Sequence, residues 1–276
     1  MDGFDNRTAI FLAAVCSQTY AQFNDPKGEF VVPRPYEQIG EIHARSLTGR
    51  SERFGFVLQS DTHVIIAFRG TSTTSDWVSD AMASQVKYRW ADNAGMSHRG
   101  FSNIYRSARD GILGLLKGIN TDKAMYLTGH SLGGALSTLC GMDMAANTEF
   151  PAPTVYSFAS PRVGDPDFTG AFQGKVGRSY RVHNRFDVVP LLPPAEFTLP
   201  KRDITFHYEH VRDSEQLTFN NGSVPGNHAI GSYYSELAKR DPRFVESLNA
   251  MNPGFCPSPS RYRFESSTRT SLVAPV

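Results

Sequence analysis

The sequence predicts an α/β fold in which a predominantly parallel central sheet is covered by helices on both faces. Short apolar segments alternate along the chain with segments of helical periodicity. The apolar segments are nearly continuous, as is typical of parallel strands that are buried on both faces. With 276 residues, of which 40% are hydrophobic, the chain is long enough for one large domain with a sizeable core.

The individual elements follow from local patterns in chain order. A helix is expected over residues 6–21, and two strands at 55–58 and 63–68 are joined by a turn at Ser60-Asp61. A helix near residues 103–117 carries apolar residues at helical spacing. The remaining expected elements are a strand at 124–127, a helix at 135–146, strands at 154–158, 179–182, 205–206 and 216–218, and a helix that starts at His228.

Domain organisation and composition restrict the class of protein. We expect a single domain over residues 1–251 and an irregular tail over 252–276, where Pro, Ser and Arg are frequent and no periodicity is visible. The net charge of +1 and the lack of a Lys/Arg cluster argue against nucleic acid as a partner. No apolar run approaches the length of a transmembrane segment.

The beginning of the chain and its cysteines bear on the cellular location. Residues 9–16 are apolar like the core of a signal peptide, but Asp2 and Asp5 precede them and no cleavage site follows. We therefore expect a cytoplasmic protein, or a secreted one if a leader has been removed. Of the three cysteines, Cys140 is expected in the core, whereas pairing of Cys16 with Cys256 is left open.

The most informative motif is Gly-His-Ser-Leu-Gly-Gly at residues 129–134. It follows an apolar strand and leads into a helix of small and apolar residues. Strand, glycine-flanked serine and helix form the context of a nucleophile elbow, in which the serine hydroxyl projects from the edge of the sheet. An ordinary turn with a capping serine is the alternative. The flanking strand and helix favour Ser131 as a nucleophile.

A serine nucleophile needs a general base, and His228 is the best candidate. It lies after a polar loop and at the start of an expected helix, so that it can be presented above the sheet edge. His207 and His210 are three positions apart, which places them on opposite sides of a strand and disfavours a shared metal site. His183 lies at a strand end and is expected to be structural.

The third partner is a carboxylate between the serine and His228. Asp187 follows an expected strand and precedes a proline-rich loop, which places it at the sheet edge. Asp165 and Asp167 lie in a turn, where aspartates usually bond to their own backbone. Asp203 is flanked by Lys201 and Arg202, which suggests a surface ion pair. We therefore predict Asp187 as the acid.

Five segments in register resemble the class 3 lipases, a family of α/β-hydrolases. They are Phe-Arg-Gly-Thr at 68–71, the elbow at 129–134, Ser-Pro-Arg-Val-Gly at 160–164, Asp-Val-Val-Pro at 187–190, and His228. The resemblance extends from about residue 38 to 234. It implies the α/β-hydrolase fold and a catalytic triad of Ser131, Asp187 and His228, the residues chosen above on other grounds.

The resemblance also implies an oxyanion hole and a lid. The oxyanion donors would be the backbone N–H groups of Thr71 and Leu132, although residues 71–75 alone also fit an ordinary Ser/Thr turn. The lid would lie at about residues 72–97, with Trp77 as an apolar anchor that contacts a lipid interface. A permanently packed surface helix is the alternative, because few large aliphatic residues accompany Trp77.

We therefore expect a triacylglycerol lipase that hydrolyses acylglycerols through an acyl-enzyme. The alternatives are a non-lipid esterase that acts on feruloyl or other short esters, a phospholipase, and a lipid-binding module on a catalytically retired hydrolase fold. No phosphate-binding or dinucleotide-binding motif follows a strand, so neither metal nor organic cofactor is expected. The sequence carries no indication of the oligomeric state.

Overall fold

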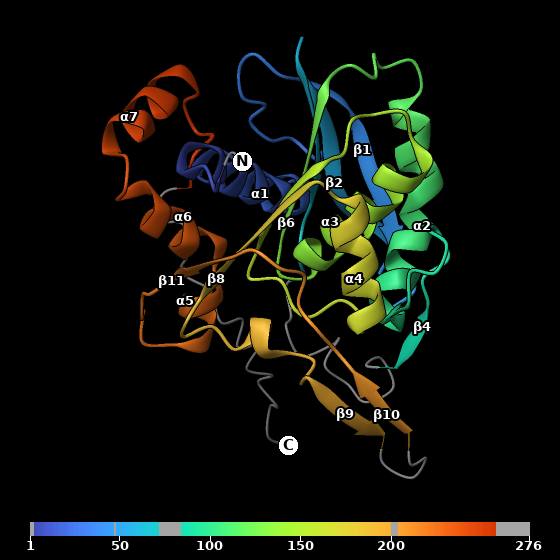
Figure 1. Ribbon diagram of the computed structural model, residues 1–276. Helices are drawn as coiled ribbons and strands as arrows, with labels where there is room; N and C mark the ends of the chain where they lie inside the picture. The colour runs from blue at the N-terminus through green and yellow to red at the C-terminus, as the bar shows by residue number, and fades with distance from the viewer. Residues whose placement is uncertain (1–2, 47, 72–83, 200–203, 258–276) are drawn as a thin grey trace, which may run out of the picture.

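A seven-stranded sheet forms the centre of the molecule in a computed structural model that describes residues 3–46, 48–71, 84–199 and 204–257 (Figure 1). In order across the sheet, the strands are β1 (Glu37–Arg45), β2 (Ser51–Gln59), β3 (His63–Phe68), β6 (Ala124–His130), β7 (Thr154–Phe158), β8 (Arg178–Asn184) and β11 (Ser214–Leu217). The first three pair antiparallel, and all pairs from β3 to β11 are parallel.

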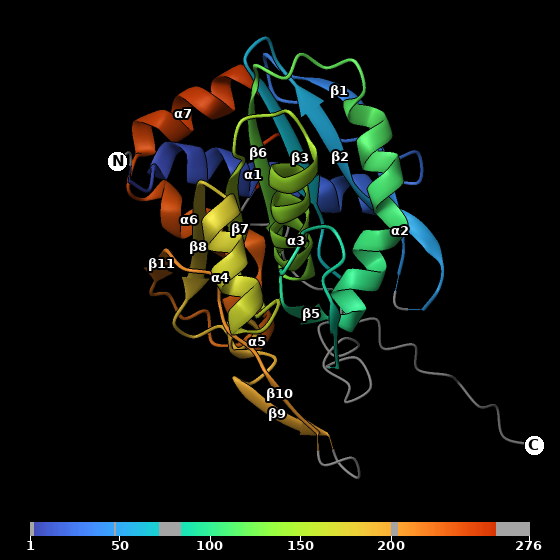
Figure 2. The same cartoon turned by 45° about the vertical axis from the view of Figure 1, so that its right-hand side comes forward.

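Helices cover both faces of this sheet, as the sequence predicts. On one face lie α2 (Arg99–Leu116), α3 (Leu132–Asn147) and α4 (Pro166–Lys175), and on the other α1 (Asn6–Asn24), α6 (Ile230–Ala238) and α7 (Pro242–Met251) (Figures 1 and 2). Successive residues of β3 point into different cores: Ile66 packs with α2 and α3, whereas Ile65 packs with α1. Burial on both sides explains the continuous apolar runs.

The short elements lie at the ends of the sheet. They are β4 (Gln85–Lys87), β5 (Met96–His98), η1 (Val189–Leu191), the hairpin of β9 (Glu196–Leu199) and β10 (Ile204–His207), and α5 (Val224–His228). The predicted helix start at His228 is wrong, because this residue ends α5 and α6 begins at Ile230. The break between the two helices leaves His228 at a turn.

Several elements were not predicted, and their sequences explain why. The edge strand β1 contains no continuous apolar run, and its pairing with β2 and the burial of Ile42 and Ala44 place it in the sheet. Two helices, α4 and α7, begin with Asp-Pro, which resembles a turn in the sequence. In both, the aspartate (Asp165 or Asp241) accepts an N-cap hydrogen bond and the proline occupies the first helical position.

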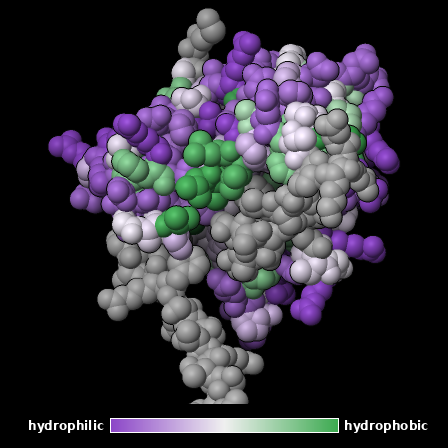
Figure 3. All heavy atoms as spheres, turned by 90° about the horizontal axis from the view of Figure 1, so that it is seen from below, coloured by the Kyte–Doolittle hydropathy of each residue, from purple (hydrophilic) through white to green (hydrophobic). Residues whose placement is uncertain are grey.

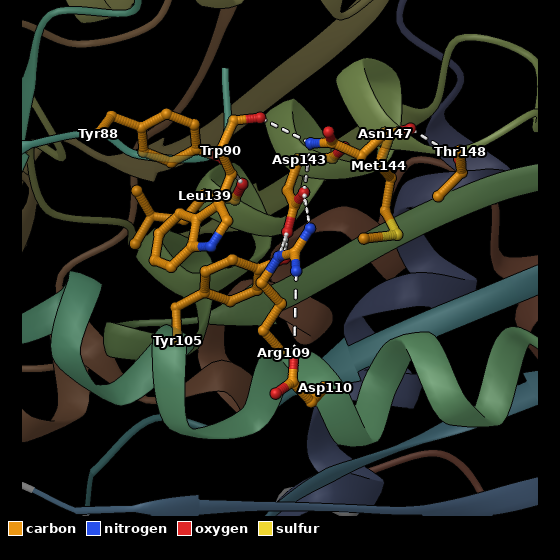
Figure 4. A network of polar contacts seen from close by, with 10 residues as sticks. All are labelled: Tyr88, Trp90, Tyr105, Arg109, Asp110, Leu139, Asp143, Met144, Asn147 and Thr148. Carbon is orange, nitrogen blue, oxygen red and sulfur yellow. Dashed lines mark hydrogen bonds and ion pairs between the residues drawn. The ribbon is translucent and has the colours of Figure 1, made fainter. Parts of the chain in front are cut away.

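A buried polar network joins α2 to α3 (Figure 4). The carboxylate of Asp143 accepts two hydrogen bonds from the guanidinium of Arg109, at 2.6 and 3.0 Å, and one from the Tyr105 hydroxyl at 2.6 Å. Asn147 donates to the same carboxylate and to the Trp90 carbonyl. Because each oxygen of the buried Asp143 has partners, its charge is compensated within the core.

The beginning of the expected tail packs against α1. Residues 252–257 form neither helix nor strand, but Phe255 is fully buried, and Gln18 donates to its carbonyl at 2.6 Å. Residues 258–276 lie outside the described residues. The three cysteines are free, so Cys16 and Cys256 do not pair. Within the described ranges, no helix has the length and apolar character needed to cross a membrane.

Candidate functional site: a serine, a histidine and a carboxylate at the sheet edge

Ser131 lies in the sharp turn between β6 and α3. Its backbone has φ 58° and ψ −127°, a combination that costs free energy for any residue with a Cβ atom. The turn is held because the Ser131 N–H donates to the Phe158 carbonyl at 2.9 Å and the Ser131 carbonyl accepts from the Gly134 N–H at 2.9 Å. The strained turn predicted from the motif is therefore present.

The glycines of the motif allow the backbones on either side of Ser131 to come close. A Cβ atom on Gly129 would overlap the carbonyl of Gly133, and one on Gly133 would overlap the carbonyl of Phe68. A Cβ atom on Gly70 would lie 2.9 Å from Cβ of Ser131. The end of β3, with the Phe-Arg-Gly-Thr segment that follows, therefore packs directly against the elbow.

His228 and Asp187 are joined by a buried hydrogen bond beside this turn. Nδ1 of His228 lies 2.8 Å from Oδ2 of Asp187, whose side chain is fully buried. Oδ1 of Asp187 accepts from the Val189 N–H at 3.0 Å. Since a carboxylate accepts at this contact, the Nδ1 atom carries the proton and Nε2 is left as a potential proton acceptor. This is the tautomer that a general base requires.

The two atoms that a proton transfer would join are both buried and unpartnered. Oγ of Ser131 and Nε2 of His228 make no hydrogen bond with any residue of the described part of the chain. The ring of His228 lies against that of His130, the residue before Ser131, with ring centroids 4.7 Å apart. Ser131 Oγ and the histidine are thus not joined by a hydrogen bond, as is common in sites without substrate.

Thr71 and Leu132 lie on the two segments that border Ser131. Leu132 is the first residue of α3, where the N–H group has no acceptor within the helix. Thr71 follows Gly70, which contacts the serine. The N-terminus of α3 also carries the positive end of the helix dipole, which favours a developing negative charge.

Trp77 and the lid residues 72–83 lie outside the described residues, whereas 84–97 contain β4 and most of β5.

The rejected candidates lie elsewhere and have other contacts. Nε2 of His210 donates to the Pro190 carbonyl at 2.7 Å, and His207 faces Glu196 on the β9–β10 hairpin. Asp165 caps α4, as expected for a turn aspartate, and His183 lies in β8. Asp167 lies in the first turn of α4, and Asp203 falls outside the described residues. Within the described ranges, no group of three or more His, Cys, Asp or Glu residues has a metal-binding arrangement.

Two tyrosines at the site were missed from the sequence. The hydroxyl of Tyr233 donates to Oδ2 of Asp187 at 2.7 Å and accepts from the Asn184 N–H at 2.9 Å. The hydroxyl of Tyr20 contacts Nδ1 of His130 at 2.7 Å. Burial raises the pKa of Tyr233 well above its ordinary value, so it remains a hydrogen-bond donor. The only available signal was the position of Tyr233 on the helix after His228.

Exposed apolar side chains flank the acid and the base. Phe186 and Val188, on either side of Asp187, are 44% and 42% exposed, and Leu191 is 60% exposed. Val224, on the helix that ends at His228, is 54% exposed. Figure 3, which shows the molecule from below, has a hydrophobic patch near the middle of this face. Such a surface around a polar site is suited to contact with an apolar ligand or interface.

The chain is similar to proteins of a known lipase family. The family model described as "Lipase (class 3)" matches residues 65–197. A rice protein (Oryza sativa subsp. indica), "Phospholipase A1-II 3", is 32% identical over an alignment of 206 residues, and the match covers 60% of this chain and 48% of that protein. "Secreted mono- and diacylglycerol lipase A" of Penicillium cyclopium is 31% identical over 175 residues, 62% of this chain and 53% of that one. The chain thus spans about half the length of these relatives.

A solved structure described as a fungal lipase has the same fold. It superposes with a TM-score of 0.62 at 23% identity and covers 80% of this chain and 84% of its own. The α/β-hydrolase fold expected from the sequence is therefore confirmed.

Proposed function

We propose that this chain, which matches the class 3 lipase family over residues 65–197, is a member of that family and hydrolyses lipid carboxylic esters, with acylglycerols as substrates. One observation carries the proposal: Nδ1 of His228 is fixed by the buried Asp187, while Nε2 of His228 and Oγ of Ser131 have no hydrogen-bond partner among the residues that the structure describes. This arrangement suits a serine that is activated by a histidine.

The chemistry follows from the roles of three side chains. Oγ of Ser131 attacks the ester carbonyl while Nε2 of His228 accepts its proton and then returns it to the leaving alcohol. Asp187 holds the imidazole in its tautomer and stabilises the imidazolium that forms. A water molecule, deprotonated by the same histidine, then releases the acid from the acyl-serine.

The oxyanion of the tetrahedral intermediate needs donors that are already in place. We assign this role to the N–H groups of Thr71 and Leu132, which lie on the two segments bordering Ser131. Each such donor contributes about 3 kcal/mol to the transition state. The positive end of α3 supports the same charge. No step requires a metal or an organic cofactor.

The apolar surroundings favour a lipid ester over a short polar ester. Phe186, Val188, Leu191 and Val224 expose apolar surface beside the acid and the base, which would contact acyl chains or a lipid interface. A phospholipase is the second candidate, because the rice relative is named a phospholipase A1. We also propose that Trp77 is the apolar anchor of a lid segment that contacts a lipid interface.

Of the two locations expected from the sequence, cytoplasmic or secreted after removal of a leader, we propose the second. The name of the Penicillium relative describes it as secreted, and nothing in the names of the reported relatives supports a cytoplasmic site. We propose secretion, with transient contact between the protein and a lipid surface.

Hydrolysis of tributyrin, measured from below to above its solubility limit, tests the proposal. We expect activity in the wild type and a loss of about 10⁶-fold in kcat for Ser131→Ala. A jump in rate when the emulsion appears would indicate a lid that opens at interfaces, and saturation below the limit would indicate an esterase with an open site. Equal rates for wild type and variant would contradict the proposed function. Phosphatidylcholine vesicles in the same assay decide between lipase and phospholipase.

A further inference from the structure

The two peptide groups that flank Gly70 are each held by a side chain, the preceding one by Tyr20 and the one shared with Thr71 by Arg69. The Gly70 N–H donates to the Tyr20 hydroxyl at 3.0 Å, and the Gly70 carbonyl accepts from Nη1 of Arg69 at 2.7 Å. The Gly70 carbonyl and the Thr71 N–H belong to one planar peptide, so the direction of the first sets the direction of the second. A hydrogen bond to that carbonyl also strengthens the N–H as a donor.

Arg69 is itself rigidly held, which allows it to orient this peptide. Its guanidinium stacks between Phe23 and Phe54, at 3.7 and 4.4 Å from the ring centroids. Nη2 donates to Glu52 at 2.6 Å and Nε to the Arg53 carbonyl at 2.6 Å. The side chain is only 3% exposed. Such contacts leave Arg69 one orientation, in which Nη1 faces the Gly70 carbonyl.

On the other side, Tyr20 connects Gly70 to the histidine pair. Nε2 of His130 lies 2.7 Å from the backbone carbonyl of His228, and because a carbonyl only accepts, this nitrogen carries the proton. Nδ1 of His130 is then an acceptor, and the Tyr20 hydroxyl donates to it at 2.7 Å. The chain of hydrogen bonds runs from Gly70 through Tyr20 and His130 to His228.

The protonation state of His130 supports this direction. Burial disfavours the imidazolium, and the nearby His228 disfavours it further, so the pKa of His130 lies well below its ordinary value. His130 therefore remains neutral when His228 takes up a proton. A neutral His130 keeps Nδ1 as an acceptor throughout the reaction.

We propose that Arg69, Tyr20 and His130 form a positioning brace that holds the Thr71 N–H and His228 in fixed places on either side of Ser131. The brace rests on the proposed function and adds residues to it that touch neither substrate nor the reacting atoms. Tyr20 is the link, because its single hydroxyl serves both Gly70 and His130. It comes from α1, more than 100 residues before the elbow.

The substitution Tyr20→Phe tests the brace because it removes the linking hydroxyl and keeps the ring. We expect kcat for a soluble p-nitrophenyl ester to fall about 10- to 100-fold, with KM changed less than about threefold. An alkylboronic acid forms an adduct with the serine that places an oxygen in the oxyanion hole. The affinity of the variant for this inhibitor should fall by a factor similar to the fall in kcat.

Tyr105→Phe is the matched control. It removes a buried hydroxyl, the one that donates to Asp143 in the network between α2 and α3 (Figure 4), and should lower stability while leaving kcat and boronate affinity unchanged. Equal kinetics in the two variants would overturn the brace. Wild-type hydrolysis that does not depend on Ser131 would instead overturn the proposed function.

A second measurement needs no variant. ¹⁵N NMR of the wild-type histidines should show His130 neutral with the proton on Nε2. A wild-type His130 that carries its proton on Nδ1 would contradict the brace, because it could not accept from Tyr20 and donate to His228 as proposed.

Discussion

The hydroxyl of Tyr233 donates to Oδ2 of Asp187, the same oxygen that accepts the Nδ1 proton of His228. Together with the Val189 N–H on Oδ1, this leaves the buried carboxylate with three donors. Three fixed donors hold the plane of the carboxylate, and the carboxylate in turn holds the imidazole. The orientation of the proposed base therefore depends on α6 as well as on the loop that carries Asp187.

Replacement of Tyr233 by phenylalanine tests this dependence. Tyr233→Phe removes a donor from Asp187 and the acceptor of the Asn184 N–H, which should cost about 1–3 kcal/mol of stability. We expect kcat to fall about tenfold as the imidazole loses its fixed orientation. Steady-state kinetics and urea unfolding measure the two effects, and a stability loss with unchanged kcat would show that Tyr233 is only structural.

Replacement of Asp187 by asparagine tests the acid itself. Asp187→Asn keeps the size of the side chain but presents an amide to Nδ1 of His228, which favours the wrong tautomer. We expect kcat to fall on the order of 10⁴-fold. Circular dichroism should show an unchanged fold. An Asp187→Asn enzyme with more than about a tenth of the wild-type kcat would exclude Asp187 as the triad acid.

Acid should destabilise the protein through His98, which is fully buried at the start of α2. Its Nδ1 accepts from the Phe101 N–H, and burial lowers its pKa to about 3. The unfolded chain binds the proton near pH 6.5, so the stability contributed by neutral His98 is complete above that pH and is lost as the pH falls towards 3. Between pH 6.5 and 3, the free energy of unfolding falls by about 1.4 kcal/mol for each pH unit.

His98→Asn isolates this contribution, because asparagine can cap the helix and does not titrate. The free energy of unfolding, measured in urea, should decrease from pH 7 to pH 5 in both proteins. The decrease should be larger in the wild type than in the variant by about 2 kcal/mol. Equal losses in the two proteins would contradict the assignment. Other titrating groups are present in both and cancel in the comparison.

The sequence predicted those parts of the site that local pattern determines. The elbow was recognisable because its glycines permit a close approach that no other residue allows, and because a strand precedes it and a helix follows. Asp187 could be chosen because it follows an expected strand, and His228 because it lies between a polar loop and an expected helix. The structure places their side chains in contact, whereas their catalytic roles and that of Ser131 remain predictions.

What the sequence did not reveal depends on contacts between distant segments. Tyr20 and His130 are 110 positions apart, and Tyr233 and Asp187 are 46 apart, so no local pattern marks either pair. Likewise, β1 is a strand because it pairs with β2, and its own residues are mostly polar. The Asp-Pro sequences that begin α4 and α7 fit a turn as well as a helix start, and only the packing of the residues that follow them decides for the helix.

The central claim is that Ser131 is a nucleophile activated by His228, and covalent labelling tests it most directly. The protein would be treated with a fluorophosphonate that carries an alkyl chain, and the modified residue located by peptide mass spectrometry. We predict one label per chain, on Ser131, and a much slower reaction in His228→Gln. A chain that stays unlabelled, or one labelled at another residue, would contradict the account.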